Sequence, residues 1–310
     1  MIEMKQKNKF ETVRIKDSGI FLSYLIVIFH WSTLKILLKY LKTVLSDFFF
    51  LQYTVKLKLR NIPVVFVGNP LDDKIPYRPD KSDTYLDFIH FWIRPLSFII
   101  KRFGVKRSLS YCAGFLSAIE DAYSQASKIY RFRMSTTTRP NHNNNKNMKI
   151  IHRVDPHYLC VPSLHIAVVT LTYTFFDDVF KKEGLSEEER KIYSKELYDG
   201  AIEIAETVLY VKQHSVNCIP AALYMMLQLQ KEIFSIEKGV SFINNLFAKA
   251  TDVSESDRNS VLNYIHYMFE RLILEGCNED DWTVPLKRWL LLQELKMTTV
   301  NKERIIESIV

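Results

Sequence analysis

Three stretches of the chain lack charged residues over a length that suits a buried or membrane-embedded helix, namely residues 18–34, 156–176 and 213–230. The first is bounded by Asp17 and Lys35, and its 17 residues would form a helix about 25 Å long. That length is just short of a hydrocarbon core of about 30 Å. We expect an uncleaved membrane anchor or an interfacial helix there, with a buried core helix as the alternative.

The other two uncharged stretches contain polar residues, which a lipid-facing helix would avoid and a helix carrying a functional site would need. Shorter apolar segments predict further helices over residues 48–57, 85–100 and 108–122. After about residue 231 the pattern becomes amphipathic and charged, which predicts water-facing helices over residues 240–248, 257–274 and 285–295. The helical prediction also runs through residues 201–229, whereas strand signals are weak except at 64–67.

This pattern predicts an all-α fold, a helical bundle that lies in or against a membrane. Residues 1–45 are expected to form a basic segment with a candidate anchor, residues 46–230 the helical core, and residues 231–310 an amphipathic helical extension. Polar loops are expected at residues 141–147 and 181–190, and Ser186 is a candidate helix cap ahead of Glu189.

Composition and charge narrow the classes of function. A chain that is 47% hydrophobic is not disordered, and its 8 glycines form no glycine-rich nucleotide-binding motif. Its mean hydropathy of −0.07 is high for a charged cytosolic enzyme and low for a chain made mostly of membrane spans. Residues 1–150 hold 25 Lys/Arg against 11 Asp/Glu, and the chain has no nucleic-acid-binding motif. We therefore expect a membrane surface, and not nucleic acid, as the partner of the basic half.

The four cysteines lie far apart and form no C-x-x-C motif, so they fit neither a disulfide framework nor a zinc site. No C-x5-R motif is present, which disfavours a cysteine-based phosphatase.

Three short motifs occur in an order that suits one site. The first is Arg139-Pro140, the second is the run C-V-P-S-L-H at residues 160–165, and the third is K-Q-H at residues 212–214. Pro162 suits the first turn of a helix, so the N–H groups that follow it would form an anion site. Arg139 and Lys212 would add two cations to this site.

Two histidines can share the work of phosphoryl transfer. One attacks phosphorus in line, while the other donates a proton to the leaving oxygen. This chemistry requires no metal or other cofactor, and the sequence offers no cluster of carboxylates that would hold one.

Over about residues 130–229 the chain resembles the type 2 phosphatidic acid phosphatase superfamily, in particular the branch with C-x-P-S-L-H and K-Q-H motifs. The superfamily comprises lipid phosphate phosphatases, bacterial acid phosphatases, vanadium haloperoxidases and sphingolipid phosphotransferases. The resemblance implies that Arg139, Ser163 and Lys212 bind phosphate. It also implies that His165 is the acid and that His214 is the nucleophile that forms a phosphohistidine.

The chain departs from this family at the residue that orients the nucleophile. The family places an aspartate four residues after the nucleophilic histidine, and that position here is Cys218. A thiol is a poor hydrogen-bond acceptor and carries no charge at neutral pH, so Asn217 is considered as an amide substitute.

The resemblance thus implies a metal-independent phosphomonoesterase that acts on a lipid phosphate at a membrane. Two alternatives stay open at this point. One is a lipid phosphotransferase of the sphingolipid or inositol-phosphoryl type, in which a lipid or inositol hydroxyl replaces water as the acceptor. The other is a membrane protein that has kept the anion pocket but has lost turnover because of Cys218.

Overall fold

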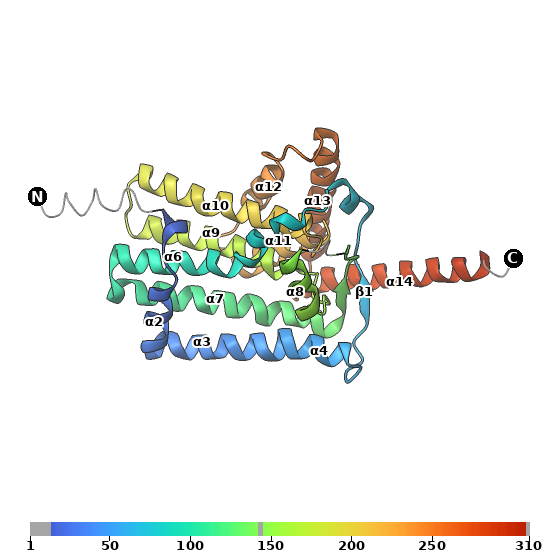
Figure 1. Cartoon of the computed structure of the whole chain (residues 1–310), viewed down its shortest axis with the longest axis horizontal. Coiled ribbons are helices and arrows are strands. Elements are labelled where there is room, and N and C mark those ends of the chain that lie inside the picture. The colour runs from blue at the N-terminus through green and yellow to red at the C-terminus, as the bar shows by residue number, and fades with distance from the viewer. Residues whose placement is uncertain (1–13, 142–144, 308–310) are drawn as a thin grey trace, which may run out of the picture.

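The structure is a computed structural model that describes residues 14–141 and 145–307, with side chains up to residue 297. It is built almost entirely from helices, as the sequence predicts, and its long helices run side by side as a bundle (Figure 1). These are α3 (Trp31–Thr43), α6 (Phe88–Phe103), α7 (Val105–Phe132), α9 (Leu164–Lys182) and α10 (Glu187–Tyr210). The helix begun by α3 continues through the π-helical stretch η2 (Val44–Phe50) into α4 (Leu51–Lys56).

The centre of the bundle is α9, which packs against α6, α7, α10 and α11 (Cys218–Leu229). Most of its residues are buried, and this explains why the sequence from Leu164 onward is apolar on every face. On the outer side, α3 packs along α7. Aromatic side chains fill the space between these helices, for example Phe115, whose ring centre lies 4.8 Å from that of Phe176.

The C-terminal part forms three helices, in agreement with the prediction, although their bounds differ. They are α12 (Ile236–Asn245), α13 (Glu255–Gly276) and α14 (Thr283–Glu307). Figure 1 shows α14 extending away from the bundle. Serine caps set the starts of α12 and α13, because Ser235 and Ser254 accept backbone N–H groups of the first turn. Ser186 forms the expected capping box with Glu189 at the start of α10.

Short elements connect the long helices of the bundle. The predicted strand is present as β1 (Val64–Phe66), which pairs in parallel with β2 (Met134–Thr136). The remaining short elements are η1 (Ile15–Asp17), α2 (Phe21–Phe29), η3 (Pro70–Lys74), η4 (Pro79–Lys81), α5 (Ser82–Leu86) and α8 (Lys146–Val154). The start of α8 overlaps the loop expected at residues 141–147, of which residues 142–144 lie outside the described residues.

Two predicted helices are interrupted in the structure. The helix expected over residues 201–229 is broken into two: α10 ends at Tyr210, and α11 begins at Cys218. Lys212 adopts a left-handed conformation with φ of 54°, which no helix can accommodate. The uncharged stretch 156–176 becomes helical only at Leu164, so Pro162 precedes the cap and is not in the first turn as predicted.

The N-terminal uncharged stretch is not one straight helix. Among the described helices, none is by itself long and apolar enough to cross a bilayer. The pair formed by residues 21–29 and 31–56 meets the length and composition criteria together, but it is bent by 104° at His30.

Candidate active site

His214 lies in the loop between α10 and α11, and its side chain is buried. Its Nδ1 is 3.2 Å from the main-chain carbonyl oxygen of Cys160. Because a carbonyl oxygen can only accept a hydrogen bond, this contact assigns the hydrogen to Nδ1 and the lone pair to Nε2. Nε2 faces the Ser163 hydroxyl at 3.3 Å and Nδ1 of His165 at 3.4 Å. Nε2 of His214 therefore faces two of the other predicted site residues.

His165 lies in the first turn of α9, where its ring is held between aromatic side chains. The ring stacks on Tyr85 with 4.7 Å between ring centres and lies 4.5 Å from that of Phe88. The two histidine ring centres are 5.4 Å apart. This packing fixes the orientation of His165, so its Nδ1 is directed at His214.

Burial keeps both histidines neutral. It lowers the pKa of His214 to about 4, an effect that the bond to the Cys160 carbonyl opposes and the charge of Arg139 reinforces. Burial also lowers the pKa of His165 well below its usual value, and His214 adds to this shift. At neutral pH the lone pair on Nε2 of His214 is therefore free of a proton and available for attack on an electrophile.

Ser163 is the cap of α9, and its hydroxyl accepts the N–H of Ile166 at 3.4 Å. The same hydroxyl faces His214, so Ser163 joins the helix start to the nucleophile. The segment before it is tied to the sheet, because the Ser135 hydroxyl accepts the N–H of Val161 at 2.8 Å. The P-S-L-H motif is thus fixed at the end of a buried helix, where an anion would face its N-terminus.

Arg139 lies beside this group, but its guanidinium is already engaged. It donates to the Asp155 carboxylate at 2.7 Å, to the Asp155 carbonyl at 3.0 Å and to the Gln213 side chain at 2.7 Å. Its Nε is buried and has no hydrogen-bond partner among the described residues. Gln213 is next to the nucleophile in the chain, so this network connects the arginine to the His214 loop.

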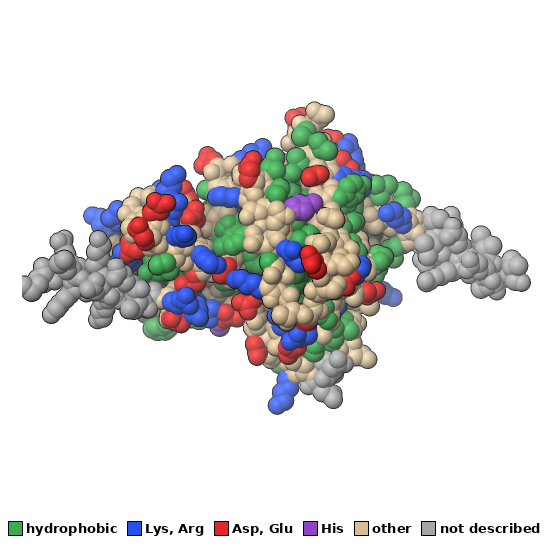
Figure 2. Space-filling view, turned by 90° about the horizontal axis from the view of Figure 1, so that it is seen from above, with side chains coloured by type: hydrophobic (Ala, Val, Ile, Leu, Met, Phe, Trp, Pro, Cys, Tyr) green, Lys and Arg blue, Asp and Glu red, His purple; other side chains and the backbone are tan. Residues whose placement is uncertain are grey.

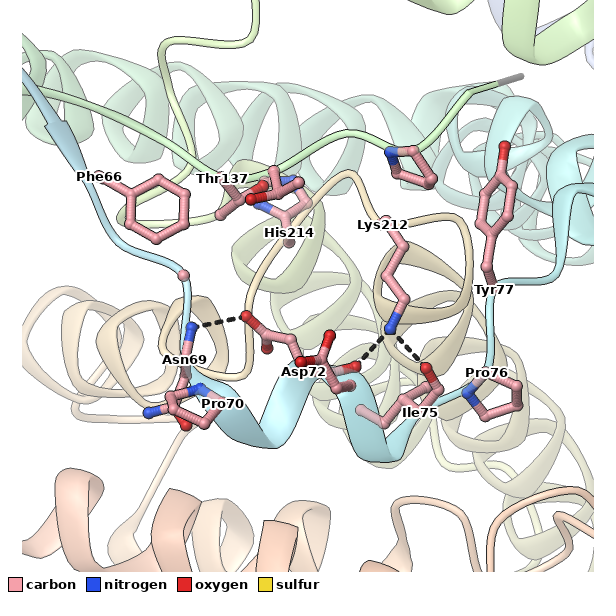
Figure 3. Close-up of a pocket in the computed structure, with 14 residues that line it drawn as sticks. Phe66, Asn69, Pro70, Asp72, Ile75, Pro76, Tyr77, Thr137, Lys212 and His214 are labelled. Carbon is pink, nitrogen blue, oxygen red and sulfur yellow. Dashed lines mark hydrogen bonds between the residues drawn. The ribbon is translucent and has the colours of Figure 1, made fainter. Parts of the chain in front are cut away.

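Lys212 occupies a different side of the nucleophile. Its Nζ donates to the backbone carbonyls of Asp72, in η3, and of Ile75, which directly follows η3, as the dashed lines of Figure 3 show. Burial lowers the pKa of Lys212, and the negative charges of Asp72 and Asp73 oppose that shift. The structure therefore brings Lys212 near His214 without directing its ammonium group at Nε2.

Neither Cys218 nor Asn217 orients His214 in this structure. The Asn217 amide donates to the Val67 carbonyl at 3.0 Å, and its oxygen accepts the Tyr264 hydroxyl at 2.6 Å. Cys218 is the first residue of α11, where its N–H bonds to the Ser215 carbonyl. Among the described contacts, the orienting partner of the histidine is instead the carbonyl of Cys160, within the second motif.

Two cavities meet at His214. The polar cavity, of about 570 Å³, is lined by residues that include Lys212, Thr137 and Asp72 (Figure 3). The apolar cavity, of about 360 Å³, is lined by His165, Gln213 and Asp155 together with a larger set of apolar side chains. His214 lines both, whereas Lys212 and His165 line different ones.

Several residues of the site were not predicted. Asp72 accepts the N–H of Val216 at 2.8 Å and the Ser215 hydroxyl at 3.1 Å, and thus fixes the loop directly after the nucleophile. Asp155 holds the arginine. Asp155 stands five residues before Cys160, the first residue of the second motif, and this proximity is the only local signal for it. No local signal in the sequence points to Asp72.

Among the described residues, no group of three or more His, Cys, Asp or Glu side chains is arranged to hold a metal ion. No protein-family model, curated protein or solved structure matches this chain, so the geometry above is the basis on which a function can be proposed.

Proposed function

We propose that this protein is a metal-independent phosphoryl-transfer enzyme that hydrolyses a lipid phosphate at a membrane, with His214 as the nucleophile. One observation carries the proposal: the buried His214 ring has Nδ1 on a carbonyl oxygen, and its free Nε2 faces Ser163 and His165. This arrangement provides a neutral nucleophile with an acid beside it and a helix N-terminus opposite.

The reaction would take place in two steps. Nε2 of His214 attacks phosphorus and the ester P–O bond breaks, while His165 donates a proton to the leaving oxygen. Water then attacks the phosphohistidine, and the now neutral His165 takes a proton from that water as the P–N bond breaks. A bound phosphate dianion would raise the pKa of His165 against the effect of burial, because a nearby negative charge favours the protonated ring.

The phosphoryl oxygens need donors at the start of α9. The Ser163 hydroxyl lies 3.3 Å from Nε2 of His214, and the N–H groups of Leu164 and His165 follow it in the first turn. Arg139 would contribute once the phosphate competes with Asp155 for its guanidinium. Lys212 would act at longer range, as a positive charge in the polar cavity.

The apolar cavity favours a lipid as the substrate. It borders His165 and His214 and is lined by aromatic and aliphatic side chains, which include Phe48, Tyr123 and Leu164. A hydrocarbon chain in this cavity would be removed from water, and each buried CH₂ contributes about 0.8 kcal/mol to binding. A membrane location agrees with the bent apolar pair of helices near the N-terminus, residues 21–29 and 31–56.

The proposal is tested with the purified chain in EDTA, using 4-nitrophenyl phosphate and dispersed phosphatidic acid as substrates. We expect phosphate release from both, and complete loss in His214→Ala. The exposed His90 provides the matched control, because its imidazole pairs with Asp87 and lines neither of the two cavities at His214. Activity that is equal in wild type and His214→Ala would overturn the proposal.

A second experiment separates the roles of the two histidines. In His165→Asn the proton donor is missing, so phosphatidic acid, whose leaving alcohol is a poor leaving group, should lose far more rate than 4-nitrophenyl phosphate. Quenching this variant in an alkaline denaturant, in which a phosphohistidine survives, should trap that species, and it should be absent in His214→Ala. Because kcat/KM reports the phosphorylation step and not the later hydrolysis, equal losses of kcat/KM for the two substrates would mean that His165 is not the acid.

The alternative function is phosphate binding without turnover. Its specific support is that Nδ1 of His214 is held by a carbonyl oxygen, which supplies no countercharge for a phosphorylated imidazole. Binding of phosphate to the wild type with no release from either substrate would favour this alternative. Adding inositol or a diacylglycerol to the active enzyme would distinguish transfer from hydrolysis through the phosphorylated product.

A further inference from the structure

The mouth of the apolar cavity is surrounded by exposed apolar side chains and by basic residues. On α8, Ile150 is 58% exposed and Val154 is 49% exposed, and both also line the cavity. The charged residues of the same helix are Lys146, Lys149 and Arg153, all exposed, and α8 contains no acidic residue. A short helix with exposed apolar and basic residues is typical of a surface that binds anionic lipid.

A second helix, which runs from α3 into η2, brings exposed apolar and basic side chains to the same cavity from the other side. Leu38, Leu41, Leu45 and Phe49 follow one another at helical spacing along α3 and η2, and all four are exposed. Phe49 also lines the cavity, so this row of side chains, the leucine row, leads directly to the mouth. Exposed apolar side chains in a continuous row mark an interaction surface.

The two helices are connected at the mouth. The hydroxyl of Tyr53 in α4 donates a hydrogen bond to the carbonyl of Val154, the last residue of α8. Leu86, the last residue of α5, and Ile89, in the first turn of α6, complete the exposed apolar rim, and both line the cavity. The rim thus consists of side chains from four elements around one opening.

Basic residues predominate on α8 and on the helix that runs from α3 to α4. Residues 31–60 contain one acidic residue, Asp47, and it pairs with Arg131. The basic residues of that segment are Lys35, Lys39, Lys42, Lys56, Lys58 and Arg60. The end of the bundle near the N-terminus differs, because basic and acidic side chains lie intermixed over it in Figure 2. There Lys195 pairs with Asp199 on α10.

We propose that the rim and the leucine row, together called the docking face, bind peripherally to an anionic lipid bilayer and open the apolar cavity toward it. The basic residues would contact anionic headgroups, while the apolar side chains enter the interface between headgroups and acyl chains. The inference deepens the proposed function, because a lipid could enter the cavity without crossing water. Binding to the bilayer does not depend on the chemistry of His214, so the two proposals can fail separately.

The contribution of the basic residues to bilayer binding is tested by sedimentation of the chain with vesicles of phosphatidylcholine alone or mixed with phosphatidylglycerol. We expect the full chain to bind mixed vesicles and to bind neutral ones at least about tenfold more weakly. Lys149→Glu/Arg153→Glu should lose about tenfold or more in affinity for mixed vesicles, because each basic residue near the surface contributes on the order of 1 kcal/mol. The control Lys181→Glu/Lys191→Glu makes the same charge change at exposed sites of α9 and α10 and should bind like wild type.

The contribution of the apolar side chains to bilayer binding is tested with a second pair of double variants. Leu45→Ser/Ile150→Ser removes two exposed apolar side chains of the docking face, whereas Ile192→Ser/Leu274→Ser removes two elsewhere that are 57% and 72% exposed. The first pair should weaken vesicle binding and the second should not. Circular dichroism of all four double variants should match wild type, since the altered side chains are exposed.

His214→Ala separates this inference from the proposed function, because it should bind vesicles like wild type even though it cannot turn over. Equal binding to neutral and mixed vesicles, or no effect of either docking-face variant, would overturn the inference. Self-association of the wild type in the absence of lipid, if Leu45→Ser/Ile150→Ser abolished it, would also overturn the inference. The docking face would then be covered by a second copy of the chain.

Discussion

Nδ1 of His214 donates its hydrogen bond to the main-chain carbonyl oxygen of Cys160, at 3.2 Å. In the family that the chain resembles, a carboxylate performs this task. A carbonyl oxygen fixes the same tautomer, but it supplies only a dipole and no countercharge for the histidine once it is phosphorylated. The orientation of the His214 ring therefore does not require an acidic residue at position 218.

The first prediction concerns Cys218→Asp. The Cys218 side chain is fully buried, so a carboxylate there would be charged and desolvated without a cation bonded to it. Because His214 already has an acceptor for Nδ1, we expect no gain in turnover, and a loss of about 2–4 kcal/mol in the free energy of unfolding. Urea unfolding and phosphate release measure the two effects.

Cys218→Ser is the control for this substitution, since it has nearly the same size and no charge. It should cost about 1–2 kcal/mol and leave turnover unchanged. A tenfold or greater gain in turnover in Cys218→Asp would show that the carbonyl of Cys160 is an inadequate partner, and that the chain has lost activity through this position.

The second prediction concerns stability below neutral pH. In the unfolded chain His214 binds a proton near pH 6.5, whereas burial lowers its pKa to about 4 in the folded protein. Between these values only the unfolded state holds the proton, so acidification lowers the free energy of unfolding. From pH 7 to pH 5 this single group should remove about 2 kcal/mol.

Urea unfolding of wild type and His214→Asn at pH 7 and pH 5 measures this contribution. The wild type should lose more stability than the variant over this range, by about 2 kcal/mol. His165 and His157, whose pKa values are also lowered by burial, would keep part of the pH dependence in both proteins. Identical pH dependence of the two proteins would contradict the shifted pKa of His214.

The sequence predicts the helical fold well, because long uncharged apolar runs are a local signal. It also predicts a helix that opens at the second motif, but with Pro162 in the first turn, whereas Ser163 is the cap and α9 begins at Leu164. The loop at residues 211–217 cannot be inferred in this way. Its apolar neighbours continue the helical pattern, and what breaks the helix is a set of bonds to Asp72, which lies more than a hundred residues away.

The orienting group is beyond prediction for a different reason. Any residue has a carbonyl, so the identity of Cys160 carries no information about its role toward His214. Likewise, R-P indicates a phosphate ligand, but only the folded chain reveals that Asp155 already occupies the guanidinium of Arg139.

The third prediction follows from that ion pair. Asp155→Asn removes a negative charge from the bottom of the apolar cavity and releases Arg139 for a phosphate. We expect inorganic phosphate to bind about threefold to tenfold more tightly, as measured by calorimetry. Asp252→Asn is the control, because it breaks an ion pair with Arg78 away from His214. Weaker binding in Asp155→Asn would mean that Asp155 serves to position Arg139.

The fourth prediction tests the anchor of the His214 loop. Asp72 accepts two backbone N–H groups and one hydroxyl, so Asp72→Asn replaces an acceptor by an NH₂ group that faces a donor. We expect a loss of about 1–3 kcal/mol in the free energy of unfolding, and a kcat lower by about tenfold or more because the nucleophile shifts. The adjacent Asp73 is exposed, and Asp73→Asn should change neither quantity. Equal effects of the two substitutions would exclude this role.

The last prediction concerns the length of the hydrocarbon chain on the substrate. The apolar cavity has a volume of about 360 Å³ and borders the two histidines, so a longer alkyl phosphate should bury more of its chain beside the reacting phosphorus. With alkyl phosphates below their micellar concentration, kcat/KM should rise by about fourfold for each added CH₂ until the cavity is filled, and then level off. Leu164 lines this cavity and is buried, so Leu164→Phe, which reduces its volume, should move the plateau to shorter chains. A kcat/KM that is independent of chain length in wild type would mean that the cavity does not receive the substrate, whereas a plateau unmoved by Leu164→Phe would mean that the chain lies elsewhere along the rim.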